Sequence, residues 1–580
     1  MCDGRYHVTC YLNGMVAARP VVLASRVRSL FLPGVLLGAC LGVCLGALGC
    51  GGKREDVERA PASRQTVPPS AIRPGDRTST PAVGENAASG EASGTGEQPA
   101  EPAEFPKETR SLELVRTASV RLEPSDDAKR IGTVAVDTRV GWTRTASGKG
   151  CQKSWALLRP RGWICADYVR PSTKPPLGRE LPVLDRGEIV PGTYGKITAE
   201  RAVTFTIERP EPKPDPKKGE KKRKKAEPAP KKGGGSSGSS GGGLITSPRQ
   251  VDATIPDASG ALPPSPSPSP SGSRLVEDKP IVGSVNVRQY DEVTLDGRRF
   301  WKIHPKEPEY VLSSAISPHR PSGYAGARLG DDTGWELPIA FVWSRWGGPA
   351  HPMTSAQGAG LYPTPIPART PVPILETVSD AAGKPTAYRI GDARWLWAAD
   401  VRVFQPVPPP QLLEPGERWI DIDLDSQILV AFEGQLPVYA TMISSGSRET
   451  PTETGEYRMW LKEAEADMKG LNGEDPYSVA TVPWTQFFSP EKGLALHTAY
   501  WHDQFGVRRS HGCVNLAPRD ARWLYFWSDP QVPPGWTMAA GVVESPGSIV
   551  RVRTKEEPTP PPKGYAKKVV EARQQRAPVR

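Results

Sequence analysis

Cysteine and histidine are scarce in this chain, which has eight cysteines and seven histidines among its 580 residues. Five of the cysteines lie at or before Cys50, so only Cys151, Cys165 and Cys513 remain beyond it. In an oxidising compartment, the short separation of Cys151 and Cys165 predicts a disulfide between two strands of one small domain. Cys513 is then left as an unpaired thiol, which requires an explanation in an exported protein.

Large apolar residues are almost absent from residues 51–107, where Ala, Glu, Pro, Ser, Gly and Thr predominate. Such a segment cannot bury enough surface to offset the entropy lost on folding, so it is predicted to be a disordered spacer. A second linker is predicted at residues 210–279, where a basic run, a Gly-rich stretch and a Pro-Ser alternation follow one another. Residues 554–580 are predicted to form a basic disordered tail.

Acidic residues are fewer than basic ones, 64 against 74, and the formal net charge is +10. More than half of this excess is local, because residues 211–232 hold ten Lys or Arg and only four Asp or Glu. A solvated basic tether explains the charge better than a nucleic-acid site, so no nucleic-acid partner is expected. Anionic wall polymers or lipid headgroups would be the weak partners of such a run.

The apolar run from Leu30 to Cys50 carries no charge and follows Arg26 and Arg28. This pattern predicts an export signal within residues 1–50, with a retained membrane span as the alternative. Cysteines inside the run favour lipid attachment at Cys50, or at Cys40, which ends a match to the bacterial lipobox pattern. We therefore expect a membrane-anchored lipoprotein of the cell envelope, located in the periplasm.

Helices of convincing length are not indicated between the two linkers, where short strand-like runs alternate with Gly, Pro and Asp turns. Residues 108–172 resemble bacterial SH3-like domains in these strands. Looser versions of the pattern predict a second SH3-like barrel split between residues 173–209 and 280–320, and a third at residues 335–408. Four tryptophans of these strands are expected in the cores, with ligand stacking as the alternative: Trp155, Trp163, Trp301 and Trp395.

The sequence pattern changes in residues 415–553. Apolar and acidic residues alternate from Trp419 to Leu424, and two further apolar runs follow after short turns, which predicts an antiparallel meander ending near Ile443. Residues 444–475 are charged and rich in turns, and strands are predicted at Tyr477 to Phe488 and Gly493 to His497. Pro518 is well placed to begin a short amphipathic helix after Cys513.

Three of the seven histidines, His497, His502 and His511, lie within seventeen residues of Cys513. If the chain is extended locally, His511 and Cys513 point to the same side, because they are two residues apart. Strand pairing across the loop of residues 498–509 would bring His497 to Cys513. An imidazole can then take the thiol proton and hold an ion pair, and backbone N–H groups near Gly512 and Cys513 could stabilise an oxyanion.

This segment resembles the signature of the YkuD-type L,D-transpeptidases, a His followed by a Ser-His-Gly-Cys-x-Asn block. The resemblance covers about residues 417–553 and implies a mixed, β-sandwich-like catalytic fold with a short helix after the active cysteine. It implies that Cys513 is the nucleophile and His497 the proton acceptor and donor. His511, Gly512 and Asn515 would shape the oxyanion pocket. The remaining residues implicated in substrate binding are Ser510, Asn515, Arg509, Trp484 and Tyr500.

The family reaction is a two-step acyl transfer on peptidoglycan. The thiolate attacks a tetrapeptide stem, releases D-Ala and leaves a thioester, which an amine acceptor then resolves. The acceptor could be another stem, a protein to be anchored, a D-amino acid or water. No metal or organic cofactor is required. The whole chain is thus predicted to be mainly β, with SH3-like barrels and disordered linkers before the catalytic domain.

Three other readings of the same residues compete with this one. The three histidines and Cys513 could bind zinc, although the flanking Ser510 and Asn515 are better explained by acyl transfer. The chain could also be a noncatalytic peptidoglycan-binding lipoprotein with a relict C-terminal domain. A papain-type or NlpC-type endopeptidase usually has its Cys before its His, which is the reverse of the order seen here.

Overall fold

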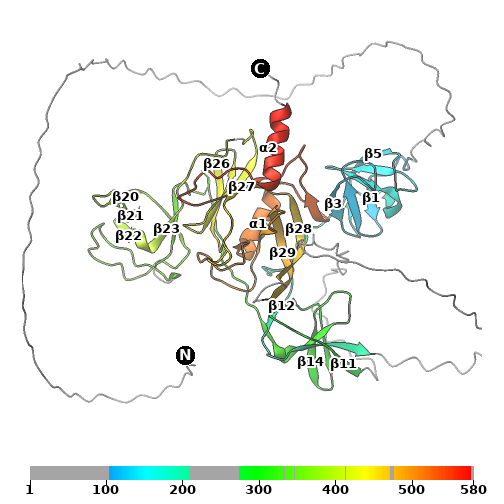
Figure 1. Cartoon of the computed structure of the whole chain (residues 1–580), viewed down its shortest axis with the longest axis horizontal. Helices are drawn as coiled ribbons and strands as arrows, with labels where there is room; N and C mark the ends of the chain where they lie inside the picture. The colour runs from blue at the N-terminus through cyan, green and yellow to red at the C-terminus, as the bar shows by residue number, and fades with distance from the viewer. Residues whose placement is uncertain are drawn as a thin grey trace, which may run out of the picture. The chain divides into compact units, whose positions relative to one another are not determined.

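The structure is a computed structural model that describes residues 104–208, 274–330, 333–344, 347–411, 413–470 and 476–576 (Figure 1). All of them lie in one compact unit, Thr95–Arg580. The predicted signal, the lipidation sites Cys40 and Cys50, and most of both linkers lie outside the described residues. Among the residues described, no helix is long and apolar enough to cross a membrane.

The N-terminal module, residues 104–172, is built from short strands in two sheets. Its elements are β1 (Ser111–Leu114), β2 (Ala118–Arg121), β3 (Arg130–Val134), β4 (Arg139–Val140), β5 (Trp142–Ala146), β6 (Trp155–Leu158), β7 (Trp163–Cys165), η1 (Ala166–Tyr168) and β8 (Val169–Ser172). One sheet has the order β4-β1-β8, and the other runs β3-β2-β7-β6-β5. Leu112, Val120 and Ile164 are completely buried between them.

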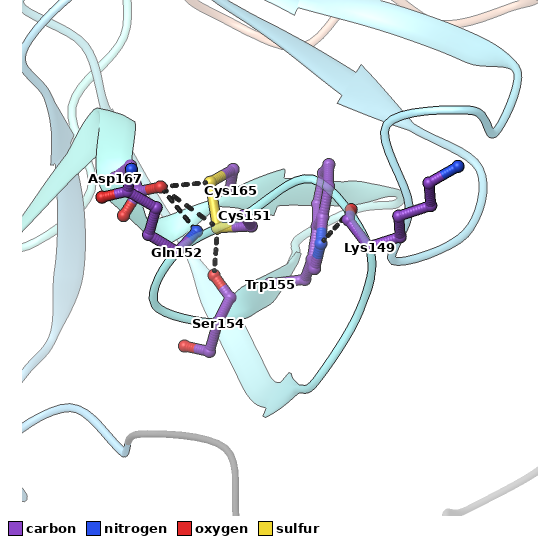
Figure 2. Close-up of a disulfide and its surroundings, with 7 residues drawn as sticks. All are labelled: Lys149, Cys151, Gln152, Ser154, Trp155, Cys165 and Asp167. Carbon is purple, nitrogen blue, oxygen red and sulfur yellow. Dashed lines mark hydrogen bonds between the residues drawn. A yellow bond between two sulfur atoms is a disulfide. The ribbon is translucent and has the colours of Figure 1, made fainter. Parts of the chain in front are cut away.

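The predicted disulfide between Cys151 and Cys165 is present, with the two Cα atoms 5.6 Å apart. Figure 2 shows the bridge beside Asp167, whose carboxylate accepts a hydrogen bond of 2.9 Å from the Gln152 N–H. Trp155 lies next to the bridge and donates through its indole nitrogen to the Lys149 carbonyl at 3.2 Å. The bridge therefore ties β7 to the loop before β6 in the N-terminal module.

The second module lies on both sides of residues 209–273. Its elements are β9 (Tyr194–Ile197), β10 (Val203–Glu208), β11 (Arg274–Pro280), β12 (Ser284–Arg288), β13 (Asp291–Leu295), β14 (Arg298–Lys302), β15 (Tyr310–Leu312), η2 (Ser313–Ala315) and β16 (Ile316–Pro318). Strands β10 and β11 pair antiparallel from Val203 opposite Pro280 to Glu208 opposite Arg274. The prediction that the linker extends to residue 279 is therefore wrong, because β11 completes the edge of the sheet.

The third module, residues 333–411, has two small three-stranded sheets, β19-β18-β23 and β20-β21-β22. Its elements are β18 (Ile339–Val342), β19 (Pro371–Pro373), β20 (Glu376–Ser379), β21 (Pro385–Gly391), β22 (Arg394–Trp397), η4 (Ala398–Asp400) and β23 (Val401–Val403). Of the four tryptophans expected in cores, Trp155, Trp163 and Trp301 are buried, whereas Trp395 is partly exposed.

The C-terminal part packs two β-sheets around the helix that follows Cys513 (Figure 1). Its elements are β24 (Arg418–Asp423), β25 (Ile428–Glu433), β26 (Leu436–Met442), β27 (Gly455–Arg458), β28 (Leu461–Gly470), β29 (Tyr477–Ser489), β30 (Leu494–Thr498), β31 (Val514–Leu516), α1 (Pro518–Trp527), β32 (Trp536–Ala540), β33 (Ile549–Arg553) and α2 (Gly564–Arg576). The predicted meander is β24-β25-β26, and α1 begins at Pro518 as expected.

The first of these sheets extends beyond the C-terminal segment in sequence. Its order is β17-β26-β25-β24-β33-β27, and its edge strand β17 (Ala327–Arg328) comes from residues upstream of the third module.

The structure corrects two further expectations from the sequence. Residues 444–475 contain β27 and β28 as well as turns, because charged side chains on β28 find buried partners: Lys462 donates to the Tyr525 carbonyl at 2.7 Å.

The predicted disordered tail is the second correction, because residues 564–576 form helix α2. This helix buries Ala566 and Val569 completely or almost so. Arg573 forms ion pairs with Glu417 at 2.6 Å and with Glu414 at 3.0 Å. Because only two small apolar side chains of the described helix are buried, its sequence lacks the apolar stripe that would have predicted a helix.

Candidate active site

Strand pairing brings the two predicted catalytic residues together. Strand β30 pairs parallel with β31, with His497 opposite Asn515. The Cys513 sulfur interacts with the backbone N–H of Ala495 and lies 3.8 Å from the Gly493 carbonyl oxygen. The sulfur therefore lies beside the start of β30, two residues before His497, and Ala495 and His497 project from the same face of this strand.

His497 is held in a form that can accept a proton. Its side chain is 3% exposed, and its Nδ1 lies 3.0 Å from the carbonyl oxygen of Thr498. Because a carbonyl oxygen only accepts, Nδ1 carries the hydrogen and Nε2 has the free lone pair. Burial lowers the pKa of His497 to about 4, although the Thr498 carbonyl partly opposes this shift. The imidazole is therefore neutral near pH 7.

Cys513 is the free cysteine of the described residues. Burial of its sulfur raises the pKa of the thiol to about 11, and the Ala495 N–H partly opposes the increase. The sequence predicts an ion pair between a Cys513 thiolate and an imidazolium ion. Desolvation instead favours the neutral forms of both groups, because it penalises a charge on either one. Proton transfer from Cys513 to His497 is then expected to accompany nucleophilic attack.

His502 and Asn515 form a polar pair next to His497. The Gln504 N–H donates to His502 Nδ1 at 3.2 Å, and His502 Nε2 lies 3.0 Å from the Asn515 amide nitrogen. Burial lowers the pKa of His502 to about 3, so its one hydrogen must be on Nε2. Turning the Asn515 amide by 180° then places its oxygen toward Nε2–H and leaves its NH2 group as a donor.

The Ser-His-Gly-Cys loop is fixed by hydrogen bonds that involve Ser510. Its hydroxyl donates to the Cys513 carbonyl and accepts from the Gly512 N–H at 3.2 Å. Gly512 has a φ of +117°, and a Cβ there would lie 3.1 Å from Leu494. A residue with a side chain would therefore be strained at this position. The Gly512 N–H is occupied by Ser510, which leaves the Cys513 N–H as the nearer candidate for an oxyanion.

A second segment supports this loop, and sequence reasoning missed it. Thr452 donates to the Gly512 carbonyl at 2.7 Å, and Thr450 donates to the Ser510 carbonyl at 2.9 Å. The backbones of Ser444 and Asn515 also exchange two hydrogen bonds, of 3.0 and 2.9 Å. The turn of residues 444–452 thus holds the catalytic loop against the first sheet. The many Ser and Thr residues of this turn were the feature of the sequence that could have indicated its supporting role.

His511 is exposed and stacks on Tyr477, with the ring centroids 4.4 Å apart. Burial raises the pKa of Tyr477, and a negative charge on the neighbouring Cys513 sulfur would raise it further. Tyr477 begins β29 and was not among the predicted site residues. It lies at the opening of the site beside His511, which is a position where it could contact a substrate.

The other predicted substrate contacts lie elsewhere. Trp484 and Tyr500 are both fully buried, and Tyr500 stacks on Tyr194 of the second module at 4.0 Å. Neither side chain is available to a substrate in this conformation, so their predicted role stays without support. Arg509 is exposed and pairs with Gln504. Arg508 donates to the Leu424 carbonyl at 2.8 Å, which favours a structural role.

The zinc alternative requires His497, His502, His511 and Cys513 to converge. In the part of the chain that the structure describes, one group of three candidate ligands has its ligand atoms within 4.8 Å of one another: Cys151, Cys165 and Asp167. Two of these form the disulfide. His511 is directed to Tyr477 and His502 to Asn515, so these side chains do not share one centre.

Comparisons with known proteins agree with the motif. The family model of the YkuD L,D-transpeptidase catalytic domain matches residues 417–554. Among solved structures, a variant of the Enterococcus faecium L,D-transpeptidase is 27% identical over 24% of this chain and 50% of its own, with a TM-score of 0.19. This chain therefore spans half the length of that protein. An L,D-transpeptidase from Mycobacterium smegmatis is 17% identical over 39% of this chain and 87% of its own, with a TM-score of 0.20.

No curated protein matches the chain. The family match includes His497, Cys513 and the Ser510 to Asn515 block whose geometry is described above. The same range begins at the first strand of the meander and ends with β33, so it coincides with the C-terminal pair of sheets. Residues 417–554 are an L,D-transpeptidase catalytic domain of the YkuD family.

Proposed function

We propose that this protein is a cysteine-dependent L,D-transpeptidase that acts on the stem peptides of peptidoglycan. The observation that carries the proposal is a free Cys513 thiol whose sulfur lies beside the start of β30, the strand from which His497 presents an unprotonated Nε2. A neutral imidazole next to a thiol is a general base and a nucleophile within one site. The family match over residues 417–554 supports the same reaction class.

In the first half-reaction, the Cys513 thiol gives its proton to His497 Nε2 while its sulfur attacks the carbonyl of the third stem residue. The C–N bond to D-Ala then breaks, and His497 returns the proton to the departing amine. The product is a thioester between Cys513 and the shortened stem. We assign the Cys513 N–H and the Asn515 NH2 group to the oxyanion of the tetrahedral intermediate.

In the second half-reaction, an amine acceptor attacks the thioester carbonyl. His497 takes the proton of the attacking amine and returns it to the Cys513 sulfur as the C–S bond breaks. The new amide is a cross-link if the acceptor is another stem, or an anchored protein if the acceptor is a protein amine. His511 is exposed and stacks on the partly buried Tyr477, so its ring is accessible to an incoming peptide.

We further propose that the three upstream modules are SH3-like β-barrels at residues 108–172, 173–208 with 274–320, and 335–408. Their short strands and closed cores support this assignment. In this proposal they target the enzyme to the wall, while the N-terminal segment anchors it to the membrane through Cys50 or Cys40. The enzyme would then act in the periplasm, at the cell envelope.

The test is incubation of the purified chain with tetrapeptide muropeptides, followed by mass analysis. The parent is expected to release D-Ala and to form a cross-linked dimer, whereas Cys513→Ala should form neither, because it lacks the sulfur. Cys151→Ala with Cys165→Ala is the matched control, since it removes two other sulfurs outside the site.

Release of D-Ala without a dimer would mean that water or a D-amino acid is the acceptor. Equal product from the parent and Cys513→Ala would overturn the proposal. Activity lost to a chelator but not to a thiol alkylator would instead favour the zinc alternative.

A further inference from the structure

The loop of residues 499–509, called the histidine loop below, connects the two parts of the active site. It begins after β30, which ends with His497-Thr498, and it leads into the Ser510 block. It also carries His502, which contacts Asn515 at 3.0 Å. Any displacement of the histidine loop would therefore move groups that lie beside His497 and Cys513.

Side chains from outside the catalytic domain hold this loop. Arg369 of the third module reaches Asp503 with both ends of its guanidinium group, including an NH2 to Oδ2 distance of 2.9 Å. It also donates to the Asp503 carbonyl at 3.3 Å, and the hydroxyl of Ser322 donates to the same carboxylate. The side-chain partners of Asp503 in the described structure thus come from residues upstream of 417.

The Arg369 side chain is itself fixed in place. It is 20% exposed and lies over the ring of Tyr324 at 5.0 Å. The Tyr324 hydroxyl accepts from the Met442 N–H at 3.1 Å, which ties it to β26. The Arg369 N–H donates to the Val342 carbonyl at 2.7 Å, and its φ of +64° is in the left-handed region. A bidentate guanidinium held this way is better ordered than an ordinary surface pair.

Two further contacts enclose the same loop. The ring of Trp343, also from the third module, lies where a Cβ on Gly506 would be, at 2.8 Å. Gly506 donates to the Ile443 carbonyl at 2.7 Å and has a φ of +106°. On the other side, Tyr194 stacks on Tyr500. Within this enclosure, two contacts lie next to His502: the ion pair with Asp503, and the ring of Phe505, which is 5.1 Å from that of His502 and stacks on Tyr324.

We propose that Arg369 is a positioning residue for the active site, because its fork on Asp503 fixes the histidine loop and with it the His502–Asn515 pair beside His497. The inference rests on the proposed function in that Asn515 is assigned to the oxyanion. It adds that the family segment of residues 417–554 is incomplete by itself, since the third module supplies a group on which its geometry depends. A misplacement of about 1 Å in such a site can cost a hundredfold in rate.

The test compares the full-length parent with Arg369→Ala, Asp503→Asn and the double variant. Arg389→Ala is the matched control, because Arg389 forms a 2.9 Å ion pair with Glu376 in the same module, away from the loop. The first readout is amide hydrogen exchange of the peptide that covers residues 499–509. The second is kcat and KM for muropeptide cross-linking.

Arg369→Ala is expected to speed exchange in residues 499–509 by at least fivefold and to lower kcat about tenfold with KM little changed. The double variant should be no worse than the worse single variant, because both single variants break the same contact. Arg389→Ala should match the parent in both readouts.

Exchange in residues 499–509 that is equal in Arg369→Ala and the parent would overturn the inference. So would a kcat equal to that of Arg389→Ala, or losses that add in the double variant. If the parent forms no product from muropeptides, the proposed function fails by itself, and the exchange measurement still decides whether Arg369 orders the loop.

Discussion

The N-terminal module and the third module both share an apolar core with the catalytic domain, but the third module adds a polar contact with the histidine loop. Strand β3 pairs with β32, with Gly132 opposite Ala539, and the Trp536 ring lies where a Gly132 Cβ would be, at 2.0 Å. One apolar cluster includes residues of both parts. The third module also shares an apolar cluster with the catalytic domain, through Ile339, Phe341 and Phe404. In addition, it reaches the histidine loop through the polar Arg369–Asp503 contact.

The difference separates stability from positioning. A shared sheet and a shared core contribute free energy to folding. A polar fork on a loop contributes less to folding, yet it sets where the neighbouring His502 lies. We therefore expect changes at the first contact to alter the free energy of unfolding, and changes at the second to alter rate.

The largest expected effect on stability is that of Trp536→Ala. Trp536 is 1% exposed, so its removal should leave a cavity and lower the free energy of unfolding by about 3 to 5 kcal/mol. The cross-linking rate per folded molecule should be unchanged. Urea unfolding measures the first quantity, and thiol titration of active enzyme normalises the second. Trp397→Ala, which removes a 40% exposed tryptophan of the third module, is the control.

A loss below about 1 kcal/mol in Trp536→Ala would show that the two parts do not share a core. If Trp536→Ala lowered the cross-linking rate but kept the free energy of unfolding, this contact would also have a positioning role. The proposed difference between the two contacts would then be wrong.

A smaller effect is expected when the disulfide is removed by Cys151→Ala with Cys165→Ala. The bridge closes a loop of 14 residues, so its loss should lower the free energy of unfolding by about 3 kcal/mol. Denaturant unfolding of the double variant, compared with the parent in reductant, checks this value. The cross-linking rate should stay within twofold, and a tenfold fall would link the N-terminal module to the active site.

Acid should also distinguish the N-terminal module from the catalytic domain. The N-terminal module contains no histidine, whereas burial lowers the pKa of His497 to about 4 and that of His502 to about 3. The unfolded imidazole has a pKa of about 6.5, so the unfolded state binds more protons between pH 6.5 and 4. Stability is therefore full above pH 6.5 and falls as pH is lowered through this window.

Limited proteolysis at pH 7.5 and pH 4.5 checks the location of this effect. Cleavage near the histidine loop should increase at the lower pH, while residues 104–172 stay protected. His502→Gln should reduce the dependence on pH, because it removes one of the buried groups. Equal cleavage near the histidine loop at both pH values would contradict this prediction.

The active site could be predicted from the sequence because its signal is local. His497, Ser510 and Cys513 are close in the chain, and the period-two pattern of β30 and β31 is sufficient to put them on neighbouring strands. The ionic state of the pair could not be predicted in this way. It depends on burial by segments such as β29, which pairs with β12 of the second module as well as with β28 and β30.

The contacts between modules could not be predicted from the sequence either, because their partners are far apart in the chain. Arg369 and Asp503 are 134 residues apart, and each is an ordinary charged residue in its own segment. Likewise, Lys462 and Glu465 made β28 look like a solvated turn, although Lys462 is completely buried and Glu465 pairs with Arg288 of the second module. Charged side chains that find partners across modules hide a strand from any local pattern.

The pairing of β10 with β11 changes what the long insertion between them can do. Glu208 and Arg274 are opposite each other in the same ladder, so the chain leaves and re-enters the second module at adjacent positions. The length of the chain between Glu208 and Arg274 therefore cannot change the spacing of the two strands that it joins, because the ladder fixes the distance between entry and exit.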